Sequence, residues 1–175
     1  LEVLEAPPRR SEAAMSFDEP NKRIIVHGGW ANQWYGDVHV LDVASRDHDL
    51  TAFLSGVDVC YCDGAGVVLG ARLLGEHLPG RMTGSDWIHD LAARAAAEGW
   101  RIGWLGGAPG VTEAAARALQ RQHPGVAIPF TGHGYLSEAG SRAAVDALNA
   151  SGADIVLVGM GTPVQERWVA RWRGE

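Results

Sequence analysis

The strongest constraint on the fold is an alternation of short apolar segments with longer amphipathic ones. Apolar runs of strand length occupy residues 24–27, 57–62, 101–105, 126–130 and 154–158. The segments between them have the apolar spacing of helices. This alternation predicts a single α/β domain, with a Rossmann-like, mainly parallel sheet covered by helices on both faces.

The expected helices have recognisable boundaries. A helix over 38–54 would have Asp37 as N-cap, and one running to Glu98 would be capped by Thr83 or Ser85. Ser137 begins another, which ends near Asn149. The remaining helices are expected at 67–74, at 111–122 and from about residue 163.

Residues 1–22 differ from the rest of the chain. They contain three prolines and no sustained period. They are interpreted as a mobile tail or a remnant of expression, so the α/β domain is 23–175. At the other end the chain stops at a helix, where such folds often continue with a strand, so we expect the domain to be truncated at its C-terminus.

Composition excludes several classes of protein. A formal net charge of -6 argues against a general nucleic-acid binder, which needs a basic face. No apolar run is long enough to span a bilayer, and no signal peptide is visible, so a cytoplasmic location is expected. Cys60 and Cys62 are read as small buried residues in a reducing compartment, and no metal site is expected.

In a parallel sheet with right-handed crossovers, all strand carboxyl ends lie at one edge, outside which ligands bind. Four glycine-containing loops follow predicted strands: DGAG, GGAPG, TGHGY and GMGTP. We therefore expect a binding site along this edge.

Asp63 is the first candidate in these loops. It ends a strand and precedes Gly64 and Gly66, which let a ligand approach the backbone. Its carboxylate is suited to act as a general base, or alternatively to cap the next helix. From spacing alone the two interpretations are even.

The other candidates divide into binding and structural interpretations. Arg81 can pair with a diphosphate, and Thr83 supplies a hydroxyl, in the segment that continues with Gly84 and Asp86. The loop that begins with Gly106 and Gly107 is interpreted either as a phosphate-binding loop, with free backbone N–H groups, or as a tight connection between a strand and a helix. The remaining candidates lie in the last two loops or just after them: His133, Tyr135, Gly161, Gln165 and Glu166.

Taken in order, these motifs resemble the WecG/TagA/CpsF family of bacterial glycosyltransferases. The matching segments are VDVCYCDGAGVV, GRMTGSD, WLGGAPGV, HPGVAI, GHGYL and NASGADIVLVGMGTPVQERWV, within roughly residues 37–172. Each piece alone is unspecific, whereas the ordered set is specific.

The resemblance implies a metal-independent, inverting transfer of N-acetylmannosamine or a related hexose from a UDP-sugar donor, with no cofactor. The implied acceptor is a sugar on a polyprenyl diphosphate, in the synthesis of teichoic acid or another cell-surface polysaccharide. It also implies peripheral contact with the inner face of the plasma membrane, and leaves a homo-oligomer open. Asp63 matches the family's proposed base, and Gln165 matches a glutamine near the donor.

Two departures qualify this resemblance. The family usually has a Thr-x-Asn pair lining the pocket, and those positions here are Tyr35 and Asp37, unless Asn32 substitutes through a different alignment. The divergent segment 30–37 indicates a different sugar or acceptor. A basic C-terminal appendage, whose arginines steady the leaving diphosphate and contact the membrane, is expected to be missing, which weakens membrane contact.

Two alternatives to an active transferase stay open. One is a catalytically impaired module that binds a UDP-sugar or serves in assembly. The other is a nicotinamide-dependent oxidoreductase, which rests only on the Gly64, Gly66 and Gly70 spacing.

Overall fold

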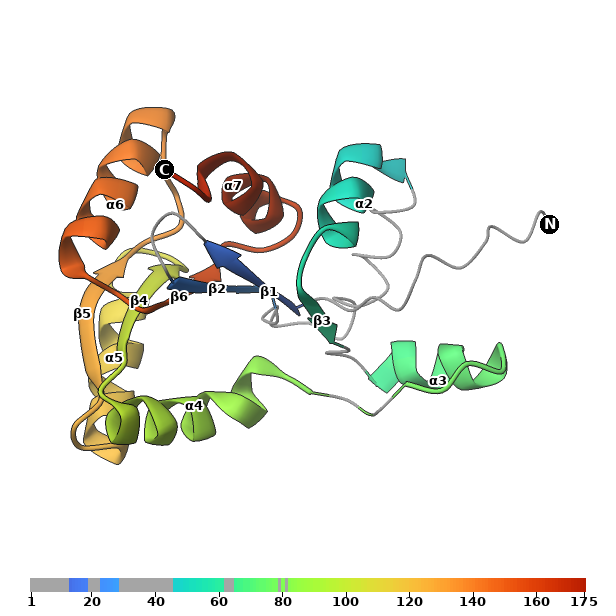
Figure 1. The fold of residues 1–175 in the computed structure, drawn as a ribbon, viewed down its shortest axis with the longest axis horizontal. Helices are drawn as coiled ribbons and strands as arrows, with labels where there is room; N and C mark the ends of the chain where they lie inside the picture. Colours follow the sequence, from blue (N-terminus) through green and yellow to red (C-terminus); the bar gives the residue numbers. More distant parts are fainter. Residues whose placement is uncertain (1–12, 19–22, 29–45, 62–64, 79, 81) are drawn as a thin grey trace.

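The computed structural model describes residues 13–18, 23–28, 46–61, 65–78, 80 and 82–175. In these residues the chain forms a sheet with helices on both faces (Figure 1). The predicted α/β class is confirmed.

Six strands in the described residues form this sheet. They are β1 (Ala13–Asp18), β2 (Arg23–Gly28), β3 (Val59–Tyr61), β4 (Arg101–Gly106), β5 (Ala127–Gly132) and β6 (Ile155–Gly159). Their order is β3-β1-β2-β6-β4-β5. The pairs β2–β6, β6–β4 and β4–β5 are parallel, whereas β1 is antiparallel to both its neighbours.

Strand β1 departs from the sequence prediction. Residues 13–18 lie in the segment interpreted as a tail, yet they pair with β2 and β3 inside the sheet. The expectation that order begins near Arg23 is therefore wrong for these residues. The polar residues and the proline that follow β1 in the sequence indicated a loop. The strand forms because β2 and β3 supply its hydrogen-bonding partners on its two sides.

The helices divide between the two faces. They are α2 (His48–Ser55), α3 (Ala65–Leu73), α4 (Gly84–Glu98), α5 (Val111–Gln122), α6 (Glu138–Ser151) and α7 (Val164–Trp172). Ala92 and Ala95 of α4 and Leu119 of α5 pack with Ile155 and Leu157 on one face. Leu148 of α6 and Val169 of α7 pack with Val156 and Val158 on the other. Because β6 alternates its side chains between two covered faces, it reads as a continuous apolar run.

Helix starts agree with the sequence in most places. Ser137 is the N-cap of α6, and its hydroxyl accepts from the N–H of Gly140 at 3.1 Å. Thr83 directly precedes α4, and its carbonyl accepts from the N–H of Trp87, so Ser85 lies inside the helix. The predicted continuous helix over 38–54 is wrong at Asp47, whose side chain caps α2 by accepting from Leu50. The proposed cap Asp37 lies outside the described residues.

Candidate site at the carboxyl edge of the sheet

The strand ends lie in one row, as the sequence predicted. Tyr61 of β3 and Gly28 of β2 both pair with Ala13 of β1. His27 pairs with Val158, so β2 and β6 end together, and Gly106 pairs with Gly159. Leu105 pairs with Gly132, which brings β5 into the same row. The segments that follow β2, β3, β4, β5 and β6 therefore all leave the sheet at this edge.

The loops after β4, β5 and β6 contact one another directly. The N–H of Gly107 donates to the carbonyl of Gly159 at 2.9 Å, and the N–H of Gly134 donates to the carbonyl of Gly107 at 2.9 Å. A Cβ on Gly106 would lie 2.1 Å from the Gly159 carbonyl oxygen. A Cβ on Gly134 would lie 2.9 Å from the Met160 side chain. Of the two interpretations of Gly106 and Gly107, this geometry supports the tight connection, because the Gly107 N–H is already bonded.

Gln165 is buried and all four hydrogen-bonding positions of its amide are occupied. Only 3% of the residue is exposed. Its Oε1 accepts from the N–H groups of Met160 and Gly161, at 3.3 and 3.1 Å. Its Nε2 donates to Thr162 Oγ1 at 3.3 Å and to Glu166 Oε1 at 2.8 Å. In this structure the amide directs its donors and acceptors to the protein itself and so holds the β6–α7 loop in place.

Glu166 completes this network at the start of α7. It is 2% exposed, and its Oε1 also accepts from the Thr162 hydroxyl at 3.0 Å. Its Oε2 is buried with no hydrogen-bond partner among the described residues. Burial raises the pKa of Glu166, and the hydrogen bonds from Gln165 and Thr162 oppose this only in part.

His133 and Tyr135 follow β5 at the same edge but differ in exposure. Tyr135 is 77% exposed. His133 is half-buried, and its Nδ1 is buried without a hydrogen-bond partner in the described part of the chain. Both rings remain candidates for contact with a ligand, because the Tyr135 side chain is exposed and the Nδ1 of His133 has no partner among the described residues.

The second group of predicted residues lies around the starts of α3 and α4. Gly66 is in the first turn of α3 and has open space around it. Gly84 begins α4 and Asp86 lies in its first turn, while Thr83 Oγ1 lies 2.8 Å from Ser85 Oγ. Asp63, Gly64, Arg81, Tyr35 and Asp37 lie outside the described residues, so their roles stay predictions.

The two groups are separated along the edge. Strands β1 and β2 lie between β3 and β6. At about 4.8 Å per strand, the end of β3 is about 14 Å from the end of β6. A ligand that reaches both the segment after Tyr61 and the loop after Gly159 must be elongated.

Sequence reasoning missed two features of this edge. The hydroxyl of Thr162 accepts from Gln165 and donates to Glu166. The only sign of this in the sequence is that Thr162 lies three and four residues before these two polar residues. Trp87 stacks edge-on against Tyr61, with ring centroids 6.4 Å apart, close to where β3 ends. No motif marked that pair.

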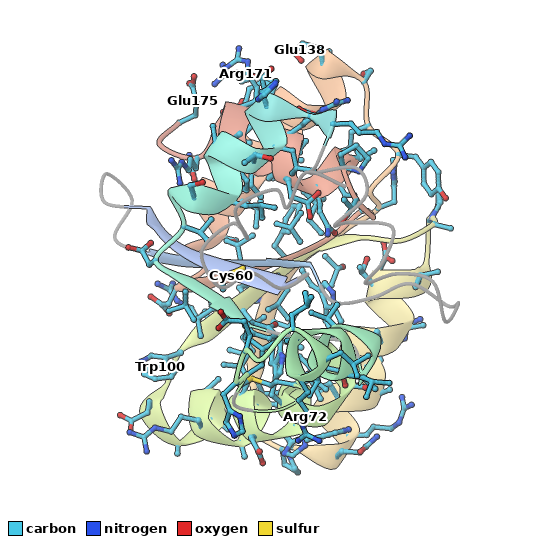
Figure 2. The ribbon with its side chains drawn as sticks, turned by 90° about the vertical axis from the view of Figure 1, so that its right-hand side faces the viewer. Cys60, Arg72, Trp100, Glu138, Arg171 and Glu175 are labelled. Atoms are coloured by element: carbon cyan, nitrogen blue, oxygen red, sulfur yellow. The ribbon has the colours of Figure 1, made fainter. Side chains whose placement is uncertain are left out.

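Two other kinds of feature are absent from the residues that the structure describes. No cluster of three or more His, Cys, Asp or Glu side chains there is arranged to hold a metal ion. None of the described helices is both long and apolar enough to cross a bilayer. Cys60, expected to be buried, is half-buried on β3 (Figure 2).

The open, mainly parallel sheet and its loop-lined carboxyl edge define a Rossmann-like α/β protein, and the carboxyl edge is where such sheets bind their ligands. The chain belongs to the glycosyl transferase WecG/TagA/CpsF family, whose model matches residues 19–175. It is 32% identical over 122 residues to a Bacillus spizizenii protein named N-acetylglucosaminyldiphosphoundecaprenol N-acetyl-beta-D-mannosaminyltransferase. That match covers 70% of this chain and 47% of the relative, so the chain spans about half the relative's length.

Proposed function

We propose that the protein transfers N-acetylmannosamine or a related hexose from a UDP-sugar to a sugar carried on a polyprenyl diphosphate. The reaction would serve the synthesis of teichoic acid or another cell-surface polysaccharide, at the inner face of the plasma membrane. Family membership and the name of the Bacillus relative support the reaction class and the lipid acceptor.

The observation that carries the proposal is the single row of strand ends. Strand β3 ends with Tyr61 at the same edge as the loops after β4, β5 and β6, and Asp63 follows two residues later in the sequence. The separation of about 14 Å along that edge suits a nucleotide sugar, with its base at one end and the transferred sugar at the other. His133, Tyr135 and the positive end of the α5 dipole are the proposed contacts for the nucleotide.

Asp63 is the proposed base, and the reaction needs no metal. Its carboxylate takes the proton from the acceptor hydroxyl as that oxygen attacks the anomeric carbon of the donor sugar. The bond from this carbon to the UDP oxygen breaks, UDP leaves with the electron pair, and the configuration inverts. Arg81 is proposed to pair with the diphosphate. Gln165 and Glu166 act on the donor through the loop they hold, because their polar groups are directed into it.

The test is Asp63→Asn in the full-length protein, assayed for sugar transfer. A general base typically accelerates a reaction roughly 10²–10⁴-fold, so the turnover number of the variant should be lower by a factor in that range. Calorimetry should show that the variant still binds UDP. Unchanged turnover in a folded variant would remove Asp63 as the base.

A second candidate is a module that binds a UDP-sugar without transferring it. The divergent positions Tyr35 and Asp37, where the family usually has Thr and Asn, favour it. The two functions separate when UDP binding and transfer are measured on the same full-length protein. Binding with no transfer supports the module. Neither binding nor transfer would contradict both.

A further inference from the structure

Two histidine rings from different helices face each other on the surface of the molecule. The Nδ1 of His89, in α4, lies 3.0 Å from the Nε2 of His123, the residue that follows α5. The ring centroids are 5.2 Å apart and the ring planes are tilted by 36°. Among the described residues, neither ring makes a hydrogen bond to any other group. Because the two residues are 34 positions apart in the sequence, no motif marked them.

Buried packing holds these two rings within reach of each other. Helices α4 and α5 cover the same face of the sheet (Figure 1). Ala92, one turn after His89, and Leu119, one turn before His123, are both buried in one apolar cluster. The backbone of His123 is fixed on both sides, since its N–H donates to Leu119 at 2.8 Å and its carbonyl accepts from Val126 at 3.2 Å. A pair of ligands that folding has already placed binds an ion with little further ordering cost.

The facing nitrogens have the spacing that a shared metal ion requires. As they stand, the two rings share one proton in an N–H···N hydrogen bond. A metal ion can replace that proton, because the neutral imidazole nitrogen is a common metal ligand. Zinc binds such nitrogens at about 2.0–2.1 Å, so two of them at tetrahedral positions lie about 3.3 Å apart, with ring centroids about 5.2 Å apart. The centroids already have this separation, and each ring has only to turn slightly.

We propose that His89 and His123 together bind one divalent transition-metal ion of the zinc type. Water would fill the remaining coordination positions, because no third His, Cys, Asp or Glu is arranged with them among the described residues. Imidazole ligands select transition metals over magnesium and calcium, which prefer oxygen. The bound ion would join α4 to the end of α5 more firmly than the shared proton does.

This metal site lies away from the carboxyl edge of the sheet. Helix α5 begins directly after the β4 loop at that edge, and His123 follows its far end. Twelve helical residues span about 18 Å, so the ion would be bound roughly that far from the edge. The inference therefore goes beyond the proposed function and does not depend on it.

The first measurement is calorimetric titration of the full chain, produced without a histidine tag and first treated with a chelator. It is done at about pH 8, where an ordinary imidazole is neutral and free to bind a metal. Zinc chloride should bind at one ion per chain, copper(II) should bind more tightly, and magnesium chloride should not bind. Zinc at 100 times its dissociation constant should raise the melting temperature by about 5 °C.

Variants that keep the hydrogen bond separate metal binding from a simple contact between helices. His89→Asn and His123→Gln place amide groups near the positions of Nδ1 and Nε2, so they can still bond across the two helices but are poor ligands. Each should bind zinc at least about tenfold more weakly, because one of two joined ligands is lost. His77→Gln is the matched control, since His77 is an exposed histidine elsewhere on the surface, and it should bind zinc as the wild type does.

Two outcomes overturn the proposal. One is a wild-type protein that gives no zinc binding and no zinc-dependent rise in melting temperature, since the pair would then be a hydrogen bond only. The other is equal zinc affinity in the wild type and in the double variant His89→Asn, His123→Gln, since the ion would then be bound elsewhere. Each variant is compared with itself in chelator, so a lower starting stability does not affect either result.

Discussion

The Oε1 atom of Gln165 accepts a hydrogen bond from the backbone N–H of Gly161 at 3.1 Å, closing the β6–α7 loop onto the first turn of α7. The same oxygen accepts from Met160. Gln165, which the motif matches to a glutamine near the sugar donor, is therefore part of the hydrogen-bonded structure of the loop itself.

Removal of the Gln165 amide should destabilise the fold. Gln165→Ala leaves the N–H groups of Met160 and Gly161 without their acceptor, so we expect a loss of about 2–3 kcal/mol in the free energy of unfolding by urea. Gln120→Ala is the control, because the Gln120 amide donates a long hydrogen bond of 3.4 Å to the carbonyl of Val126 and lies on the exposed side of α5. Equal losses in the two variants would contradict the role of the amide.

Glu166 should make stability depend on pH. Its folded pKa lies above the ordinary value of 4.5, chiefly because it is buried. Between the unfolded and folded pKa values the folded protein binds more protons than the unfolded chain, so stability falls as pH rises through this interval. Urea unfolding at a series of pH values should show the wild type losing stability relative to Glu166→Gln as pH increases from about 4 towards neutrality. A constant difference, or one of opposite slope, would refute this.

Asp47 joins α2 to α7 as well as capping α2. Its Oδ1 accepts from the N–H of Leu50 at 3.0 Å, and its Oδ2 lies 2.6 Å from Arg167. Asp47→Ala should lower the melting temperature clearly, whereas Asp47→Asn should lower it only slightly. Asn keeps an oxygen for the cap, and an exposed ion pair contributes little. Equal losses in the two variants would show that the ion pair, which both remove, contributes more than the cap.

Gly106 should tolerate no side chain. Gly106→Ala would bring a methyl group to 2.1 Å from the carbonyl oxygen of Gly159, and the backbone there has φ 152°. We expect a loss of more than about 3 kcal/mol in unfolding free energy, or failure to fold. Gly70→Ala is the matched control: no atom lies within 4 Å of its added Cβ, and Ala favours a helix. A stable Gly106→Ala protein would contradict the packing of these two loops.

Much of the fold could be predicted because local pattern and tertiary structure agree. Helix α5 has the predicted bounds of 111–122, and β6 differs from its predicted bounds by one residue at each end. Strand β1 was missed because a strand within a polar, proline-containing segment depends on its neighbours for its hydrogen bonds. The hydrogen bonds of Gln165 within its own loop could not be predicted, because the sequence places a residue in a helical turn without specifying which way its side chain points.

By itself the sequence determined the alternation of strands and helices after β1, the edge at which the loops gather, and the family. Periodicity is a local property, and the handedness of crossovers then leaves only one edge for the strand ends. The tertiary structure decided that β1 lies between β3 and β2, which puts the end of β3 about 14 Å along the edge from the end of β6. It also decided which polar groups are occupied by the protein itself, because hydrogen-bond partners of a buried amide come from backbone that only the folded chain brings near.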